Sequence, residues 1–419
     1  MYQKSTLANG LRIITATMPH ICSVSIGIFI GIGSRYETET EAGVSHFIEH
    51  LLFKGTTKRP TARIISEAIE GLGGVLNGGT GKELAVYWCK VAQQHFTLAL
   101  DVLVDMLLHS KFETEEIERE RQVIIEEINM NKDSPSQQVD MLIDELLWPG
   151  HPLGRDVAGS RESVAAISRE AILNYQSQYQ PDSTVVSIAG NVQHEEAIAI
   201  VSQALGNWTS RRQRPSYSPY QEKLDRRLQI ENRDTEQVHL CLALPGLSLF
   251  HPQRFILDLL NVILGEGMSS RLFVEIRDNL GLAYSIHSYV DHFLDSGSLS
   301  IHAGVEIKKL KTAITAILEQ LSLLKEPIPA AELSKAKELS KGRLLLQMED
   351  SRHVSGWLGG QEILTNRILT PNEVISIIDA ITTEELKQVA QEIMMGDKLR
   401  LAIVGPVAND VPLDKLLKL

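Results

Sequence analysis

Three stretches near the start of the chain have the hydrophobic pattern of sheet strands. An apolar segment at 11–15 follows the turn pair Asn9-Gly10, and residues 24–32 are β-rich and almost continuously apolar. A run of this kind is typical of a strand that is covered on at least one face. Residues 84–91 predict a third strand.

Four stretches have the length and spacing of helices. Residues 43–53 predict the first helix, and a second opens at Pro60-Thr61 and ends at Gly73-Gly74. Residues 93–108 carry an apolar stripe, and residues 115–131 are charged at first and apolar later. Strands and helices therefore share this half of the chain, which indicates an α+β fold.

The second half of the chain repeats the order of the first. A helix beginning near 167–170 and a strand at 185–192 close the first half, and the same order recurs at 381–384 and 399–407. The offset is 214 or 215 residues (167 to 381, 190 to 405), and a shift of 214 places Val24 on Val238, in another predicted strand. A chance match of short segments is the alternative to an internal duplication.

We therefore predict two homologous domains, 1–209 and 223–419. The linker between them is predicted at 210–222, because residues 210–220 lack periodicity and carry two prolines and three arginines.

Composition excludes several classes of protein. The 419 residues are 43% hydrophobic and 22% charged, and the mean hydropathy of -0.05 is near neutral, which excludes disorder, collagen-like repeats and a membrane bundle. The longest apolar run has about half of the ~20 residues that a spanning helix needs, so no membrane association is expected. The net charge of -12 argues against nucleic acid as the main partner.

Cysteine usage and the N-terminal sequence point to an intracellular setting. Cys22, Cys89 and Cys241 show no C-x-x-C spacing, so neither a disulfide framework nor a thiolate zinc site is expected. The first residues have neither the pattern of a secretion signal nor that of a presequence, and we expect a cytoplasmic protein.

The first predicted helix contains the sequence His46-Phe47-Ile48-Glu49-His50. Histidines four residues apart project from one helix face, so both imidazoles can bind one metal ion. Glu49 lies next to the same stripe, and the order H-x-x-E-H is that of the inverted zincin motif. On the motif alone, a helix with two surface histidines and a solvated glutamate remains the alternative.

A catalytic zinc site needs a third protein ligand and one open position. The carboxylates in the second part of helix 115–131 are Glu120, Glu126 and Glu127. Glu120 and Glu127 are about two turns apart on one face, whereas Glu126 points about 100° away from Glu127. We predict Glu127 as the ligand and Glu120 as a carboxylate that orients it or a histidine. Spacing alone leaves a solvated helix as an equal alternative.

These segments resemble the pitrilysin and mitochondrial processing peptidase family. Residues 46–55, with Gly43 before them, are similar to its zinc-site helix, and residues 121–128 are similar to its third-ligand helix. The resemblance implies a zinc metallopeptidase with one Zn²⁺ per chain. His46, His50 and Glu127 would bind the zinc, Glu49 would take the proton from zinc-bound water, and Glu120 would be the family's additional essential carboxylate.

A second segment of the chain carries further resemblance. Residues 270–273 and 281–285, with Arg277 between them, look like the family's second-domain segment with a substrate-binding pair, here Arg277 and Tyr284. The resemblance also implies that each domain is a mainly antiparallel sheet covered by helices and that two chains enclose a chamber in a clam-shell dimer. A homodimer is the simplest arrangement, and a heterodimer with a related chain stays open.

The internal repeat indicates that only one domain holds metal. A shift of 214 residues places His46, Glu49 and His50 on Leu260, Ile263 and Leu264, which are all aliphatic. One half would therefore build the site, and the other would shape the substrate cavity.

Peptide substrates are expected to extend a sheet edge, where backbone hydrogen bonds hold any extended sequence. The residues that match the family's edge run from Asn77 to Leu84 and Ala85, with more glycines than processing peptidases have, which leaves selectivity open. We predict a zinc endopeptidase acting on peptides or short unfolded segments. The alternative is a non-catalytic peptide-binding or scaffold subunit of a heteromeric processing peptidase.

Overall fold

The computed structural model describes residues 2–209, 216–223, 225–407 and 412–419. The first unit comprises 1–128, 156–218 and 345–370, and the second comprises 129–155, 219–344 and 371–419. The core of the predicted linker, 210–215, lies outside the described residues, and residues 216–223 contain neither helix nor strand. None of the helices in the described ranges is long and apolar enough to cross a membrane.

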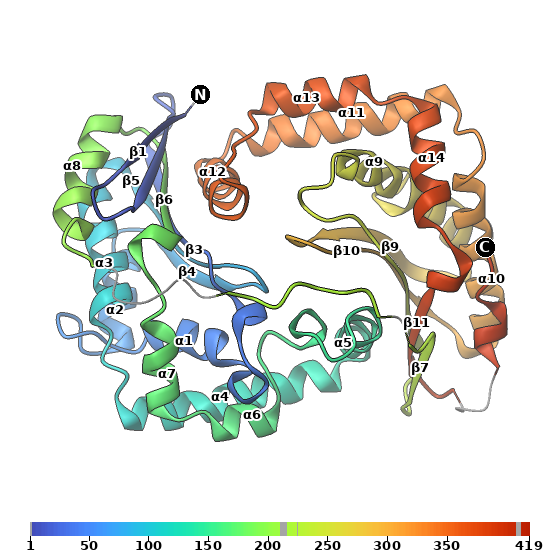
Figure 1. The fold of residues 1–419 in the computed structure, drawn as a ribbon, viewed down its shortest axis with the longest axis horizontal. Helices are drawn as coiled ribbons and strands as arrows, with labels where there is room; N and C mark the ends of the chain where they lie inside the picture. The colour runs from blue at the N-terminus through green and yellow to red at the C-terminus, as the bar shows by residue number, and fades with distance from the viewer. Residues whose placement is uncertain (1, 210–215, 224, 408–411) are drawn as a thin grey trace. The chain divides into compact units, whose positions relative to one another are not determined.

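The first unit contains one mixed sheet with the order β1-β2-β6-β3-β5-β4 (Figure 1). Its strands are β1 (Gln3–Thr6), β2 (Arg12–Thr17), β3 (Ser23–Ile30), β4 (Val75–Thr80), β5 (Ala85–Ala92) and β6 (Thr184–Gly190). Only β2 and β6 run parallel, and all other neighbours are antiparallel. The outermost strand on one side is β4.

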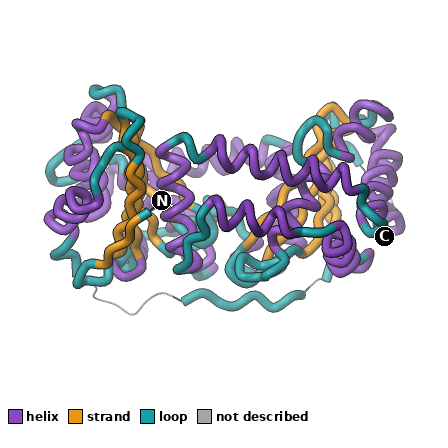
Figure 2. Tube along the Cα trace, turned by 90° about the horizontal axis from the view of Figure 1, so that it is seen from above, coloured by secondary structure: helices purple, strands orange, loops and turns teal. Residues whose placement is uncertain are grey.

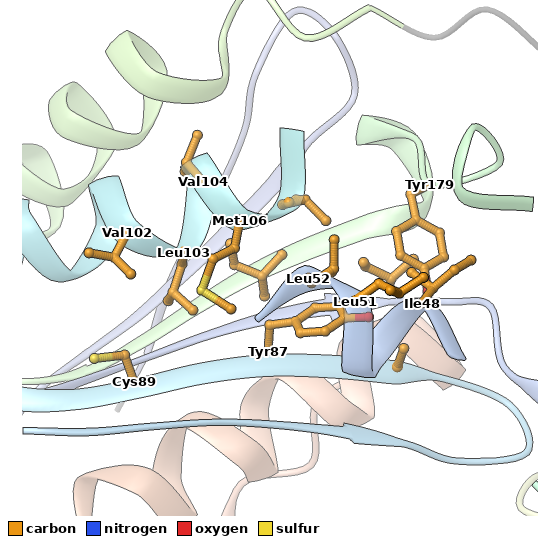
Figure 3. Packing of buried hydrophobic residues seen from close by; sticks show 14 of the residues in the cluster. Ile48, Leu51, Leu52, Tyr87, Cys89, Val102, Leu103, Val104, Met106 and Tyr179 are labelled. Atoms are coloured by element: carbon orange, nitrogen blue, oxygen red, sulfur yellow. The ribbon is translucent and has the colours of Figure 1, made fainter. Parts of the chain in front are cut away.

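Helices cover both faces of this sheet. The helices of this unit are α1 (Val44–Leu52), α2 (Ala62–Glu70), α3 (Phe96–His109), α4 (Thr114–Asp133), α6 (Arg161–Ala166), α7 (Arg169–Gln176), α8 (His194–Leu205) and α12 (Ser351–Thr365). On β3, Ile26 and Ile28 belong to the larger core, whereas Phe29 packs with α12 on the opposite face. Burial on both faces explains the continuous apolar run of this strand. Figure 3 shows part of the larger core, where Ile48 and Leu51 of α1 lie near Tyr87 of β5.

The second unit has the strand order β7-β11-β8-β10-β9. Its strands are β7 (Leu228–Asn232), β8 (Val238–Pro245), β9 (Ala283–His292), β10 (Gly297–Val305) and β11 (Arg400–Gly405). Its helices are α5 (Pro135–Leu147), α9 (Arg254–Gly265), α10 (Leu310–Leu324), α11 (Ala330–Gln347), α13 (Pro371–Ala380) and α14 (Thr383–Ile393). Figure 2 shows the strands of each unit in orange with helices in purple beside them.

The two sheets are built on one plan, as the repeat predicts. The strand order β7-β11-β8-β10-β9 matches the order β2-β6-β3-β5-β4, and within each of these sets of five strands only the first pair is parallel. Gly190 and Gly405 close equivalent strands with φ of 143° and 157°. A Cβ on Gly190 would lie 2.7 Å from the Cα of Val24, and one on Gly405 would lie 3.0 Å from the Cα of Val238. The same crowded position therefore requires glycine in both units.

Packing divides the chain differently from the predicted domains 1–209 and 223–419. Helix α5 belongs to the second unit, where Val139 and Ile143 pack with Cys241 of β8 and Val404 of β11. Helix α12, which begins 216 residues later (135 to 351), belongs to the first unit. Each half of the sequence therefore gives one helix to the other unit, because the apolar face of that helix is buried against the other sheet.

Candidate metal centre

Helix α1 starts at a position that only glycine fits. Its N-cap, Gly43, has a φ of 94°, and a Cβ there would lie 2.5 Å from the carbonyl oxygen of Ala158. The carboxylate of Glu37 accepts hydrogen bonds from the backbone N–H groups of Gly43 and Ser45, each at 2.8 Å. These bonds satisfy N–H groups that a helix start leaves free, so they fix the position of α1.

The buried face of α1 determines where its histidines point. Phe47 and Ile48 are 0% exposed in the larger core, which leaves His46, Glu49 and His50 on the partly exposed side of the helix. The predicted helix 43–53 is thus confirmed to within a residue at each end.

His46, His50 and Glu127 converge, as the spacing predicts. One ligand atom from each lies within 4.8 Å of the others, and no other group of three such residues in the described ranges meets this criterion. His46 Nε2 lies 3.7 Å from Glu127 Oε1, and His50 Nε2 lies 3.4 Å from Glu127 Oε2. Ligands on a tetrahedral zinc ion, with bonds of about 2.0–2.1 Å, lie roughly 3.3 Å apart, so the donor set fits zinc.

Of the carboxylates on α4, Glu127 faces the two histidines and Glu126 does not, as the helix geometry predicts. Glu127 is 34% exposed and reaches the histidines, whereas the Glu126 side chain is exposed and has no role in the cluster. Glu120 is 4% exposed and lies behind the metal ligands. Its Oε2 lies 3.1 Å from His50 Nδ1, and its Oε1 lies 2.7 Å from Lys54 Nζ.

Two pKa shifts suit metal binding. Burial, reinforced by the neighbouring His50, lowers the pKa of the His46 imidazole, which keeps it neutral and able to bind a cation. Burial raises the pKa of Glu120, but hydrogen bonds from His50 and Lys54 outweigh it, and the pKa lies below its ordinary value. Glu120 is therefore ionised when it accepts the proton of His50.

Glu49 is held by the edge strand. The hydroxyl of Thr80, in β4, donates to Glu49 Oε2 at 2.5 Å. This hydrogen bond fixes one carboxylate oxygen of Glu49 beside the edge strand.

The edge predicted for peptide binding is β4, but it ends earlier than expected. Asn77 lies on β4 and pairs with Trp88 of β5. Because β4 is the last strand in the order, its other edge has no neighbouring strand in the sheet. Ala85 belongs instead to β5, where it pairs with Thr80 on one side and Ile30 on the other. Leu84 lies in the intervening turn, where its carbonyl accepts from Gly81. Neither Leu84 nor Ala85 therefore lies on a free edge, which corrects the prediction for both.

Arg277 and Tyr284 lie together in the second unit. Arg277 belongs to the helical turn Phe273–Asn279, and Tyr284 belongs to β9, the outermost strand of its sheet. The guanidinium lies over the Tyr284 ring, 4.9 Å from its centroid, and Tyr284 is 77% exposed. The pair is thus preassembled around an exposed aromatic ring.

The second unit lacks the metal ligands, as the repeat predicts. Leu260, Ile263 and Leu264 lie on α9 and are 0%, 2% and 0% exposed. Core packing occupies the positions that correspond to the candidate metal ligands of the first unit.

Sequence reasoning gave three residues no role at the metal centre, namely Lys54, Glu37 and Thr80, although Thr80 lies within the predicted peptide-binding edge. Lys54 lies four residues after His50, and on a helix this spacing predicts that the two side chains are neighbours. Glu37 and Thr80 are separated from α1 by other segments of the chain, so no local spacing predicts their hydrogen bonds to it.

Comparisons with known proteins agree over nearly the whole chain. Residues 12–161 match the family model "Insulinase (Peptidase family M16)", and residues 166–340 match "Peptidase M16 inactive domain". The uncharacterized zinc protease YmxG of Bacillus subtilis is 36% identical over 98% of this chain and 99% of its own length. The uncharacterized zinc protease ML0855 of Mycobacterium leprae is 36% identical over 99% of this chain and 94% of its own length. A protease from Helicobacter pylori has the same fold, with a TM-score of 0.90 at 22% identity, covering 97% of this chain and 99% of that one.

Proposed function

The chain belongs to peptidase family M16, and we propose that it is a zinc-dependent endopeptidase that cleaves peptides and short unfolded segments. The observation that carries the proposal is the convergence of His46, His50 and Glu127 in the first unit, with Glu49 on the same helix. Similarity to proteins named zinc proteases supports the choice of metal and reaction.

One zinc ion per chain would be held by the two Nε2 atoms and the Glu127 carboxylate. Zinc in such a site supplies polarisation of the scissile carbonyl and a lowered pKa for a water molecule at the open position. Side-chain exposures of 13% for His46, 21% for His50 and 34% for Glu127 support access to that position.

Glu49 is proposed as the general base and, later, the general acid. The Thr80 hydroxyl holds Oε2, so Oε1 accepts a proton from water and then donates it to the leaving amine. Glu120 receives the Nδ1–H of His50, which leaves the lone pair of that ring on Nε2.

Substrate binding is proposed to involve both units. An extended peptide would add a strand to β4, with backbone hydrogen bonds supplying affinity for varied sequences. Arg277 and Tyr284 are proposed to contact the same peptide. We further propose a homodimer that encloses the substrate, with a heterodimer of related chains as the alternative.

Metal analysis and peptide cleavage test the function together. The purified protein is expected to contain about one zinc per chain and to cleave a quenched fluorescent peptide. Glu49→Gln keeps the side-chain size but cannot accept a proton, so cleavage should fall at least ~10²-fold while zinc stays bound. Wild-type protein that binds zinc and peptide without cleaving would support the non-catalytic alternative.

A matched pair of substitutions tests the third ligand. Glu127→Gln should weaken zinc binding because a neutral amide is a poor ligand, whereas Glu126→Gln, one residue away and exposed, should leave zinc content and cleavage unchanged. Full zinc occupancy and activity in Glu127→Gln would remove Glu127 from the ligand set.

A further inference from the structure

Lys54 lies just beyond the helix that carries the two histidines. Helix α1 ends at Leu52, and the backbone N–H of Lys54 donates to the carbonyl of Leu51 at 3.0 Å, which holds the residue close to the helix end. Its side chain is only 30% exposed, and its ammonium group lies 2.7 Å from Glu120 Oε1. This lysine therefore points back toward the metal centre rather than into solvent.

The Glu120 carboxylate bridges Lys54 and His50. Oε1 faces the ammonium of Lys54, and Oε2 lies 3.1 Å from Nδ1 of His50. With the Glu120 side chain only 6% exposed, few water molecules can replace either partner. Among the lysines and arginines in the described part of the chain, only Lys54 lies within ion-pair distance of Glu120.

A buried carboxylate with one partner can rotate, whereas one with both oxygens engaged is fixed in orientation. A neutral imidazole has its lone pair on only one nitrogen. Only the tautomer with hydrogen on Nδ1 presents a lone pair at Nε2, the atom that lies 3.4 Å from Glu127. The orientation of Glu120 therefore decides how often His50 is ready to bind a metal ion.

We propose that Lys54 is a positioning residue of the metal centre, which fixes Glu120 so that His50 presents its Nε2 lone pair to the ion. The inference rests on the proposed function, because it assumes that His50 binds zinc. If Lys54 acted instead by direct repulsion of the zinc ion, removing its charge would strengthen zinc binding. The direction of the change in zinc affinity therefore distinguishes repulsion from positioning.

Zinc affinity, measured by chelator competition on metal-free protein, tests the proposal. Lys54→Met should weaken zinc binding about tenfold, the lower end of the usual effect of losing a partner of a metal ligand. Lys54→Arg, which keeps the charge and its donors, should restore most of the affinity. Lys58→Met is the matched control, because Lys58 pairs with Asp101 instead and should leave affinity unchanged.

A double-mutant cycle identifies the route of the effect. If Lys54 acts through Glu120, Lys54→Met should cost nothing further in a Glu120→Gln background. Unchanged or tighter zinc binding in Lys54→Met would overturn the proposal, and so would an equal loss in both backgrounds.

A readout without zinc keeps this inference separate from the proposed function. Nitrogen-15 NMR of histidine-labelled, metal-free protein at neutral pH should show His50 as the Nδ1–H tautomer in wild type, Lys54→Arg and Lys58→Met. Lys54→Met should show a mixture of tautomers with an unchanged melting temperature. Wild type that fails to bind zinc would refute the proposed function, whereas an unaltered tautomer in Lys54→Met would refute the role of Lys54.

Discussion

At the scale of single residues, one hydrogen bond joins the edge strand β4 to helix α1. Thr80 is the last residue of β4, and its hydroxyl donates to Glu49 at 2.5 Å. A Cβ on Gly78, two residues earlier, would lie 3.2 Å from Cγ of Glu49, so the strand approaches the carboxylate closely. The strand proposed to bind peptide thus also sets the direction of the proposed base.

Removing this hydrogen bond should impair catalysis more than binding. Thr80→Val keeps the shape of the side chain but cannot donate, and loss of one hydrogen bond to a charged group, roughly 1.5 kcal/mol, should lower kcat about tenfold. KM and zinc content should change little. Steady-state kinetics with a quenched peptide measure the effect, and Thr80→Ser, which retains the hydroxyl, should stay near wild type. An unchanged kcat in Thr80→Val would show that Glu49 is positioned by other means.

At the scale of elements, α12 docks on the sheet of the first unit through small residues. Ser187 of β6 and Ser355 of α12 exchange hydrogen bonds between side-chain hydroxyl and backbone carbonyl, at 2.8 and 2.9 Å. The helix also carries two adjacent glycines, Gly359 and Gly360, with different surroundings. A Cβ on Gly359 would lie 2.3 Å from the ring of Phe29, whereas one on Gly360 would meet nothing within 4 Å.

Alanine at these two glycines should therefore change stability in opposite directions. Gly359→Ala forces the buried Phe29 ring or the helix to move, and overpacking of this kind costs about 1–3 kcal/mol. Gly360→Ala gains about 1 kcal/mol, because alanine is the better helix former. Thermal unfolding followed by circular dichroism should give a lower Tm for the first variant and a higher Tm for the second. Equal shifts would mean that α12 does not dock against Phe29.

Local periodicity predicts the elements of the site well. The helix predicted at 115–131 is α4, Thr114–Asp133, and the 3.6-residue repeat correctly separates Glu127 from the exposed Glu126. Spacing succeeds here because the ligands of one helix share that helix's own geometry.

Relations between distant segments are harder to predict. The pattern of residues 84–91 predicts one strand, observed as β5, but it does not show that β4 is the edge and that Ala85 is interior. Likewise, α5 and α12 each bury one face, and the sequence of a buried face does not specify which sheet covers it. The contact of Thr80 with Glu49 depends on this same tertiary arrangement, so no pattern along the chain reveals it.

At the scale of the whole molecule, two similar units carry different chemistry. The first holds the candidate metal ligands, and the second has aliphatic residues at Leu260, Ile263 and Leu264 but presents Arg277 over the ring of Tyr284. From the resemblance to processing peptidases, we propose that this pair acts at the metal site and that the two parts of the site can come from separate chains. One chain therefore carries both the proposed metal ligands and the proposed substrate-binding pair.

We predict that each proposed site combines Glu49 of one chain with Arg277 of another in a homodimer. The test mixes two inactive variants, Glu49→Gln and Arg277→Ala. In a mixed dimer with contact in trans, one site lacks both residues and the other is intact, so peptide cleavage should reappear on mixing. If each site uses Arg277 of its own chain, every site stays damaged and mixing restores nothing. Subunit exchange, followed by native mass spectrometry of differently tagged chains, is the necessary control. Exchange without recovered cleavage would refute the trans arrangement, and so would a strictly monomeric active enzyme.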